Sequence, residues 1–365
     1  MKVLIIPYNY PTINNSQKAI FIADQVSMLR EQGNDVTVLG AIPKTASEAI
    51  KSRCFRFGRL SEEKDVVSFP AIRGMDRLNN TLQLAIGKKL FQQFLLHNPK
   101  PNLVHVHNAS CGALALWIKK NYDIPFVVTE HSSLKWKKLC EKSLILYKES
   151  KANIAVSNAF GMHLSLKYKQ IFHYVPNVVD INFFKKADSG RITGACKTFV
   201  SIGNLTVNKN HQLAIRSVKS LLEKGYEVKL FIGGAGPEEQ QLKKLIKSLN
   251  LQKDVFLLGQ LSRLQIKDLL NRSDYFLLPS KKETFGVVLI EAMAAGLPVL
   301  ALKNGGSESI VTPEVGLLAE NEQCFIEKIS LLLKMDFQKN AIFEYVYSKF
   351  SQCAVMKTLL KIYKI

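Results

Sequence analysis

Several features are scarce in this chain of 365 residues, and each scarcity excludes a class of protein. Long apolar runs are absent, since none approaches the roughly 20 residues that a membrane-spanning helix needs. The first apolar stretch, Val3–Ile6, is too short for the core of a signal peptide, and Pro7 with a polar loop follows it. Six cysteines are scattered without a Cys-x-x-Cys pair, which argues against a disulfide framework or a zinc site. We therefore expect a protein of the reducing cytoplasm.

Acidic residues are the scarce charge. The chain has 30 Asp and Glu against 50 Lys and Arg, a net charge of +20. Most of this excess lies in residues 1–187, which carry 26 basic and 13 acidic residues. Such a surface attracts phosphate groups, whether on nucleic acid, anionic lipid or a nucleotide. The apolar content of 47% is ordinary for a globular protein, and the length allows two domains with substantial cores.

The stretch from Leu277 to Ala301 organises the second half of the chain. Tyr275–Leu278 and Val299–Ala301 are short apolar runs bounded by breakers, as expected of buried strands. Between them, Val287–Ala295 is predicted to be a helix that is apolar on every side except at Glu291. A lone buried carboxylate costs several kcal/mol unless it is paired or faces a polar cleft. Glu291 is therefore either satisfied by a neighbouring Lys or Arg, or part of a ligand site.

Glu283 favours the ligand site. It lies eight residues before Glu291, in a loop at the carboxyl end of a predicted parallel strand, where open α/β sheets bind ligands. Phe285, Gly286 and Val287 start the helix, so backbone N–H groups and a positive dipole end point toward the same place. Two carboxylates suited to hydroxyls and a helix start suited to phosphate suggest a nucleotide-sugar site.

This pair of glutamates and its surroundings resemble the signature of the family-4 retaining glycosyltransferases of GT-B architecture. The flanking segments are Pro279-Ser280, Gly296-Leu297-Pro298-Val299 and Gly305-Gly306-Ser307-Glu308. The resemblance is strong over most of the second half and scattered over the first. It implies an α/β protein with two Rossmann-like domains that face each other across a cleft, and a C-terminal helix that returns to the first domain.

Alternating strands and helices support two such domains. In the first half we predict strands at Lys2–Pro7, Asp35–Gly40, Phe55–Phe57, Val66–Phe69, Asn102–His107, Phe126–Thr129 and Asn153–Ser157, and helices at Ala19–Glu31 and Leu78–His97. In the second half we predict strands at Thr198–Ile202, Glu227–Ile232 and Val255–Gly259, and helices at Gln212–Glu223 and Phe350–Ile365. We expect an acceptor-binding domain over residues 1–184 with the helix 350–365, a linker at 185–197, and a nucleotide-sugar-binding domain over 198–349.

The resemblance assigns roles to residues of the donor site. Glu291 is expected to accept both ribose hydroxyls and Glu283 to hold hydroxyls on the transferred sugar. Lys209 is the expected cation for the diphosphate, in the loop that begins with Gly203 and Asn204. The family usually has Arg at the position of Asn204, so this chain lacks a positive charge there.

Two further positions complete the predicted donor site. Gly236 belongs to the cluster Gly233–Pro237, which lacks the third glycine of a dinucleotide fingerprint and is equally explained as a tight turn. Leu258 lies at a strand end that, in the family, offers backbone groups to the base.

The first half offers fewer site residues. His131 directly follows a predicted strand, and the family has a His at this place that contacts the transferred sugar. Asn9 and Tyr10 lie in the first loop, where many members have a Gly-Gly pair that this chain lacks, so we expect them to face the acceptor. His105 and His107 share one face of their strand, and we predict core-edge histidines hydrogen-bonded to backbone.

The predicted activity is retaining transfer of a hexose-type sugar from a nucleoside-diphosphate donor to a glycan or lipid-linked acceptor, in the synthesis of a cell-surface polysaccharide such as capsule, O-antigen or lipopolysaccharide. The chain has no Asp-x-Asp triplet, so we expect no metal ion and no cofactor beyond the donor. A nucleotide-sugar epimerase of the same architecture is one alternative. A basic nucleic-acid-binding protein is another, but no RNA-binding signature or zinc spacing supports it, and we expect no nucleic-acid partner.

The segment Leu134–Ser150 is basic and contains Trp136. Lys135, Lys137 and Lys138 beside that ring would suit anionic headgroups, although a solvated charged face explains them equally well. The interfacial interpretation predicts peripheral association with the inner face of the cytoplasmic membrane.

Overall fold

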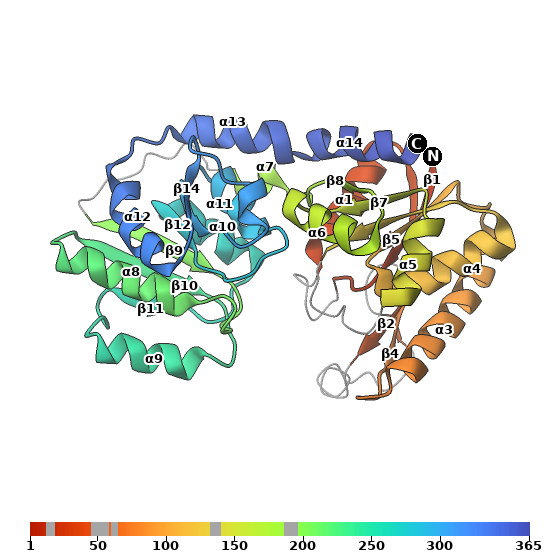
Figure 1. The fold of residues 1–365 in the computed structure, drawn as a ribbon, viewed down its shortest axis with the longest axis horizontal. Helices are drawn as coiled ribbons and strands as arrows, with labels where there is room; N and C mark the ends of the chain where they lie inside the picture. The colour runs from red at the N-terminus through yellow and green to blue at the C-terminus, as the bar shows by residue number, and fades with distance from the viewer. Residues whose placement is uncertain (12–18, 45–57, 60–64, 132–139, 186–195) are drawn as a thin grey trace. The chain divides into compact units, whose positions relative to one another are not determined.

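A computed structural model describes residues 1–11, 19–44, 58–59, 65–131, 140–185 and 196–365 of the chain. These residues form two compact units, each built on one sheet with helices packed against it (Figure 1). The first unit comprises Met1–Val156, Phe160–Val178 and Val355–Ile365, and the second comprises Ser157–Ala159 and Val179–Ala354. The predicted strand Phe55–Phe57 and most of the predicted linker lie outside the described residues.

The first unit contains eight described strands. They are β1 (Lys2–Pro7), β2 (Asp35–Lys44), β3 (Gly58–Arg59), β4 (Asp65–Pro70), β5 (Leu103–His107), β6 (Phe126–Glu130), β7 (Ala152–Ala155) and β8 (Phe172–Tyr174). Its helices are α1 (Ile20–Glu31), α3 (Asp76–His97), η1 (Ala109–Cys111), α4 (Gly112–Tyr122), α5 (Cys140–Glu149), α6 (Asn158–Tyr168) and α14 (Gln352–Lys364). The strand order is β3-β4-β2-β1-β5-β6-β7-β8, and every described pair except β3–β4 is parallel.

The second unit has an all-parallel sheet of six described strands in the order β11-β10-β9-β12-β13-β14. The strands are β9 (Lys197–Ile202), β10 (Val228–Gly233), β11 (Val255–Leu257), β12 (Tyr275–Leu278), β13 (Val299–Leu302) and β14 (Gly316–Ala319). The helices are α7 (Ile181–Phe184), α8 (His211–Glu223), α9 (Glu239–Ser248), α10 (Arg263–Arg272), α11 (Val287–Ala294), η3 (Ser307–Ser309), α12 (Glu322–Lys334) and α13 (Lys339–Phe350).

In both sheets the order in which the chain adds strands reverses next to the first strand. The chain builds outward from β1 through β2 to β4 and then restarts at β5 on the other side, and the second unit repeats this around β9 and β12. This is the doubly wound order in which ligands bind at the carboxyl ends of the strands, at the point where the order reverses. The predicted fold class is therefore confirmed.

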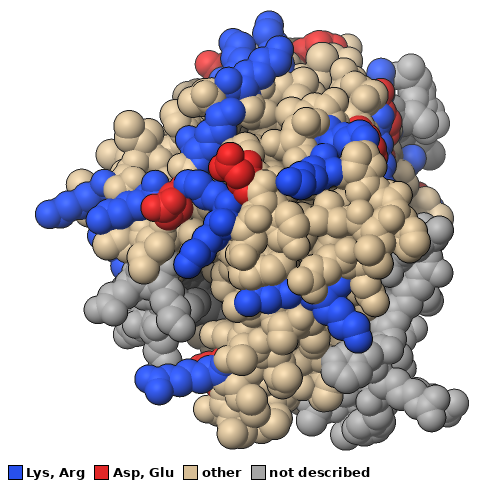
Figure 2. Space-filling view, turned by 90° about the vertical axis from the view of Figure 1, so that its right-hand side faces the viewer, with Lys and Arg blue, Asp and Glu red and all other residues tan. Residues whose placement is uncertain are grey.

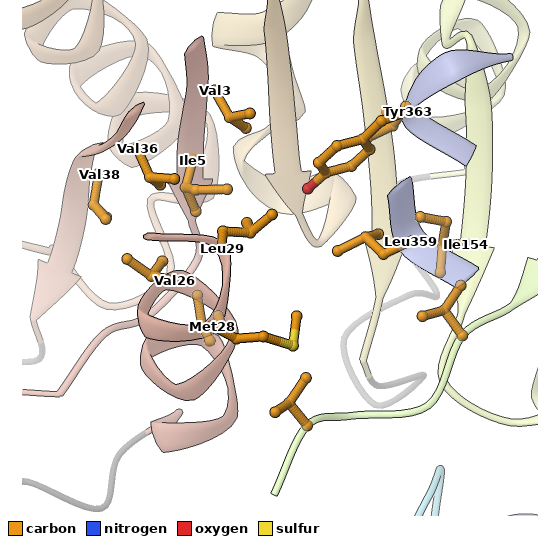
Figure 3. Close-up of a cluster of buried hydrophobic side chains, with 14 of the residues drawn as sticks. Val3, Ile5, Val26, Met28, Leu29, Val36, Val38, Ile154, Leu359 and Tyr363 are labelled. Atoms are coloured by element: carbon orange, nitrogen blue, oxygen red, sulfur yellow. The ribbon is translucent and has the colours of Figure 1, made fainter. Parts of the chain in front are cut away.

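The C-terminal helix α14 belongs to the core of the first unit. Its apolar residues recur every three or four positions, so they form one stripe, and Leu359 and Tyr363 lie among Val3, Ile5 and Ile154 (Figure 3). The predicted return of this helix to the first domain is confirmed. It is separate from α13, because the chain is extended at Ser351 between the two helices.

Candidate active site

The loops after β9 and β12 meet at the switch point of the second unit. The Lys281 N–H donates to the Asn208 carbonyl at 2.8 Å, and the Asn208 side-chain amide donates to the Lys282 carbonyl at 3.0 Å. Above this junction the Lys209 ammonium donates to Glu283 Oε1 at 2.5 Å. These side chains are 23% and 14% exposed, so a cation and a carboxylate stand together at the strand ends, accessible to a ligand.

Gly203 makes room for the Lys209 side chain. A Cβ at Gly203 would lie 3.3 Å from Lys209 Cδ and 3.4 Å from Cε. The absence of a side chain at the end of β9 therefore lets the lysine stem pass close over the backbone. Asn204, which follows, is exposed.

The start of α11 lies in the same group of loops. Gly286 is its N-cap with φ 103°, a left-handed conformation that favours glycine, and it has no side chain to cap the helix. Phe285 is buried, and the loop after β13 packs directly on it, because a Cβ at Gly306 would come within 2.5 Å of the Phe285 carbonyl oxygen. Glu308 holds that loop by accepting the N–H groups of Asn304 and Gly305 at 3.0–3.1 Å.

Glu291 lies one turn beyond Val287 on the half-buried side of α11. Val287, Val288 and Glu291 are partly exposed, whereas Leu289 and Ile290 are buried. The Glu291 carboxylate therefore lies on the same face of α11 as Val287, outside the fully buried stripe. Its predicted role toward ribose stays a prediction.

The glycine cluster after β10 allows two backbones to touch. Gly234 has φ 146°, and a Cβ there would lie 2.0 Å from the Gly203 carbonyl oxygen; a Cβ at Gly236 would lie 2.4 Å from the Leu205 carbonyl oxygen. Close packing of the loops after β9 and β10 thus explains these glycines. Leu258 donates its N–H to the Ile232 carbonyl at 2.9 Å, so a base would meet its carbonyl rather than its N–H.

His211, for which the sequence predicted no role, supports the Gly203 loop. Its Nε2 lies 3.3 Å from the Gly203 carbonyl oxygen and its Nδ1 lies 3.2 Å from Ser201 Oγ. A carbonyl can only accept, so Nε2 carries the proton and Nδ1 accepts from the serine hydroxyl. Burial lowers the pKa of His211 to about 4, so the ring is neutral at neutral pH.

In the first unit, His105 and His107 are fully buried on one face of β5, but the predicted backbone hydrogen bonds are wrong. His105 contacts side chains instead: Nδ1 lies 2.7 Å from the Tyr363 hydroxyl, and Nε2 lies 2.7 Å from Thr129 Oγ1. His107 Nδ1 lies 2.9 Å from His131 Nε2. The reason is that β5 is paired on both sides, so its backbone groups are taken by β1 and β6.

His131 is enclosed at the end of β6. Its Nδ1 lies 3.0 Å from Asn177 Oδ1, and the Phe21 ring packs on it at 4.7 Å between centroids. Burial lowers its pKa to about 3. The neighbouring first loop places Tyr8 beside His131, while the predicted acceptor residue Tyr10 is buried in the core, and Asn9 is half-buried with its Oδ1 accepting the Tyr10 N–H.

Glu130 is a buried acid for which the sequence predicted no role. It alternates with Thr129 and His131 along β6, which places its side chain on the opposite face of the sheet. Its Oε1 accepts the Ala109 N–H at 2.8 Å and the Tyr147 hydroxyl at 3.0 Å. Burial raises the pKa of this carboxyl to about 8, so it is largely protonated at neutral pH.

The basic residues and the tryptophan of the predicted membrane segment, Lys135, Trp136, Lys137 and Lys138, lie outside the described residues, whereas its second part forms α5. Within the described part of the chain, no helix is both long and apolar enough to cross a membrane. The same residues contain no group of three or more His, Cys, Asp or Glu arranged to hold a metal ion.

Two doubly wound units, the second with a lysine–glutamate pair at its switch point, have the architecture of the GT-B class. Comparison with known families agrees: the family described as "Glycosyl transferases group 1" matches residues 183–349, and "Glycosyltransferase Family 4" matches residues 19–183. The two matches together cover residues 19–349, and the chain belongs to glycosyltransferase family 4, as its sequence predicted.

Individual relatives are distant. Mannosylfructose-phosphate synthase of Agrobacterium fabrum is 28% identical over 223 residues, which cover 55% of this chain and 49% of the relative, so the match spans about half of that protein. Among solved structures, Anabaena HepE in complex with UDP has a TM-score of 0.74 at 17% identity, with both chains fully covered. The lipopolysaccharide outer core galactosyltransferase WaaB has a TM-score of 0.71 at 16% identity, covering 100% of this chain and 99% of WaaB. At these identities the structural matches establish the fold alone.

Proposed function

We propose that the enzyme transfers a hexose-type sugar from a UDP-sugar to a glycan or lipid-linked acceptor, with retention at the anomeric carbon and without a metal ion. The observation that carries the proposal is the Lys209–Glu283 pair, at the switch point of the second unit and in the same group of loops as the start of α11. UDP is the favoured nucleotide because the similar HepE structure contains it. Cell-surface polysaccharide synthesis is the favoured setting because WaaB shares the fold.

The chemistry follows from where charge develops. Breaking the bond between the anomeric carbon and the diphosphate leaves negative charge on the phosphate, which Lys209 and the N–H groups at the start of α11 would stabilise. Glu283 orients the ammonium through their hydrogen bond and would hold hydroxyls of the transferred sugar. Glu291 would accept the ribose hydroxyls, and His131 would contact the transferred sugar. In front-side attack the leaving phosphate takes the proton of the acceptor hydroxyl.

Nucleotide binding tests the donor site first. At a hundredfold excess over Kd, a bound nucleotide stabilises a protein by about 2.7 kcal/mol, which a thermal shift detects. UDP should raise the melting temperature of wild type, and GDP and ADP should raise it less. The variant Lys209→Ala should lose this response, whereas Lys243→Ala, which breaks a surface ion pair with Glu239 elsewhere in the same unit, should keep it. Equal responses of the two variants would contradict the proposal.

The reaction product separates the proposal from its alternative. Radiolabelled UDP-sugars incubated with crude membranes should label a lipid or glycan fraction. A nucleotide-sugar epimerase would instead return an epimerised donor with no label transferred.

Membrane association is the second part of the proposal. Residues 1–187 carry 26 of the 50 basic residues and only 13 of the 30 acidic ones, and Figure 2 shows a face with Lys and Arg spread over it and few Asp or Glu. Each basic residue near an anionic leaflet contributes about 1 kcal/mol. Wild type should sediment with phosphatidylglycerol vesicles at low salt and be released at high salt. Replacing Lys135, Lys137 and Lys138 by Glu should weaken sedimentation, and unchanged sedimentation would show that these residues form a solvated face.

A further inference from the structure

The buried histidines of the first unit have protonation states that their partners determine. His105 Nδ1 lies 3.4 Å from the Gln25 amide nitrogen and 2.7 Å from the Tyr363 hydroxyl. An amide nitrogen can only donate, so Nδ1 carries no proton and accepts, with the Tyr363 hydroxyl as its closer donor. The proton of His105 is therefore on Nε2, which donates to Thr129 Oγ1.

His131 and His107 have the opposite arrangement. Asn177 presents Oδ1 to His131 Nδ1, and a carbonyl oxygen can only accept, so the proton of His131 is on Nδ1. Its Nε2 is then an acceptor, and it receives the proton on His107 Nδ1 across 2.9 Å. His107 Nε2 is left with a lone pair that has no partner among the described residues.

The hydrogen bond from His107 opposes protonation of His131 at Nε2. A proton on Nε2 would set two N–H groups against each other at 2.9 Å, and His107 could relieve the conflict only by moving its own proton to Nε2, where the described residues supply no acceptor. Among the described residues, the titratable groups whose rings pack on His131 are His107 from β5, with His105 stacked behind it, and Tyr8 from the loop after β1. Burial raises the pKa of Tyr8 to about 12, so its hydroxyl is neutral at neutral pH.

We propose that Asn177 and His107 are positioning residues: Asn177 fixes the proton of His131 on Nδ1, and His107 occupies Nε2, so that the ring stays a neutral imidazole while the sugar is transferred. The proposal rests on the proposed function, in which His131 contacts that sugar. As the bond to the diphosphate oxygen breaks and the bond to the acceptor oxygen forms, positive charge develops at the sugar ring. An imidazolium next to this charge would repel it, and a neutral ring does not.

Replacing Asn177 by Asp tests this role. A carboxylate at Nδ1 would stabilise the imidazolium, so the rate of Asn177→Asp, divided by the wild-type rate at each pH, should fall roughly tenfold per pH unit below the new pKa of His131 and recover above it. Asn153→Asp is the matched control, because Asn153 is equally buried in the same unit and bonds to Ser150 and Tyr147 instead. Its rate ratio should not depend on pH in this way.

The ring nitrogens can also be observed directly, without turnover. In wild type labelled with ¹⁵N-histidine, the His131 signals, assigned with His131→Gln, should show a proton on Nδ1 and no imidazolium at pH 6; in Asn177→Asp they should show an imidazolium. A proton on Nε2 in wild type, or a wild-type pH profile in Asn177→Asp, would overturn the proposal. Absence of transfer with every UDP-sugar would overturn the proposed function instead, and the ring spectra would still decide the protonation state.

Discussion

Glu130 should make the first unit less stable as pH rises, whereas most paired acids make a protein more stable as pH rises. Its carboxyl has a folded-state pKa of about 8, against an ordinary value of 4.5. Between these values the folded protein keeps the proton and the unfolded chain has lost it, so stability is highest below pH 4.5 and is lost as pH rises toward 8. The slope is about 1.4 kcal/mol per pH unit.

Glu130→Gln removes this dependence and keeps the acceptor oxygen for the Ala109 N–H and the Tyr147 hydroxyl. Integrated from pH 6 to pH 8, this slope predicts that the free energy of unfolding of the variant, relative to that of wild type, increases by about 2 kcal/mol. The buried histidines also contribute to the pH dependence in this range, because the unfolded chain protonates them near pH 6.5 and the folded protein, where their pKa values are lowered to about 3, does not. They are common to both proteins and cancel in the difference.

Tryptophan fluorescence in urea at pH 6, 7 and 8 is the assay, because both tryptophans, Trp117 and Trp136, belong to the half of the chain that forms the first unit. Glu149→Gln is the control: this exposed acid is paired with Lys119, which lowers its pKa, so its difference from wild type should stay constant from pH 6 to pH 8. If the Glu130→Gln difference also stays constant, the carboxyl is ionised in the folded protein and the reasoning is refuted.

Three further outcomes are expected. Glu291→Gln should weaken UDP binding in a calorimetric titration, while the melting temperature of the variant without nucleotide stays near that of wild type. If the variant binds UDP normally, or if it unfolds, Glu291 has only a structural role. Transfer activity should survive excess chelator, since loss of activity that magnesium or manganese restores would show a metal requirement. Gly234→Ala should lower the melting temperature, because its Cβ would overlap the Gly203 carbonyl oxygen and such overpacking costs about 1–3 kcal/mol, whereas Gly225→Ala, with open space around it, should cost less.

Local sequence patterns determined much of the fold. The apolar run from Val287 to Ala294 could only form a buried helix, and the breakers Gly296 and Pro298 end it where the structure does. The strands on either side were predicted to within one residue, since short apolar runs between breakers need no distant partner to be recognised. The β11 prediction was two residues too long, because Gly259 adopts a positive φ after the strand.

The histidine prediction failed for a reason that local pattern does not contain. Periodicity placed His105 and His107 on one face of a strand, and that is where they lie. Periodicity could not show that this strand is central, with its backbone groups used on both sides. Nor could it show that the hydroxyl of Tyr363, which is 258 positions away in sequence, lies 2.7 Å from His105 Nδ1.

Local sequence patterns are therefore enough to place these residue types at the strand ends, and the glutamate motif is enough to indicate the family. Which of those residues meet depends on the packed unit. Lys209 and Glu283 are 74 positions apart, and they pair because β9 and β12 are neighbours at the reversal of strand order. That order results from how the helices cover the sheet and from the handedness of the crossovers, which are properties of the whole packed unit rather than of any segment.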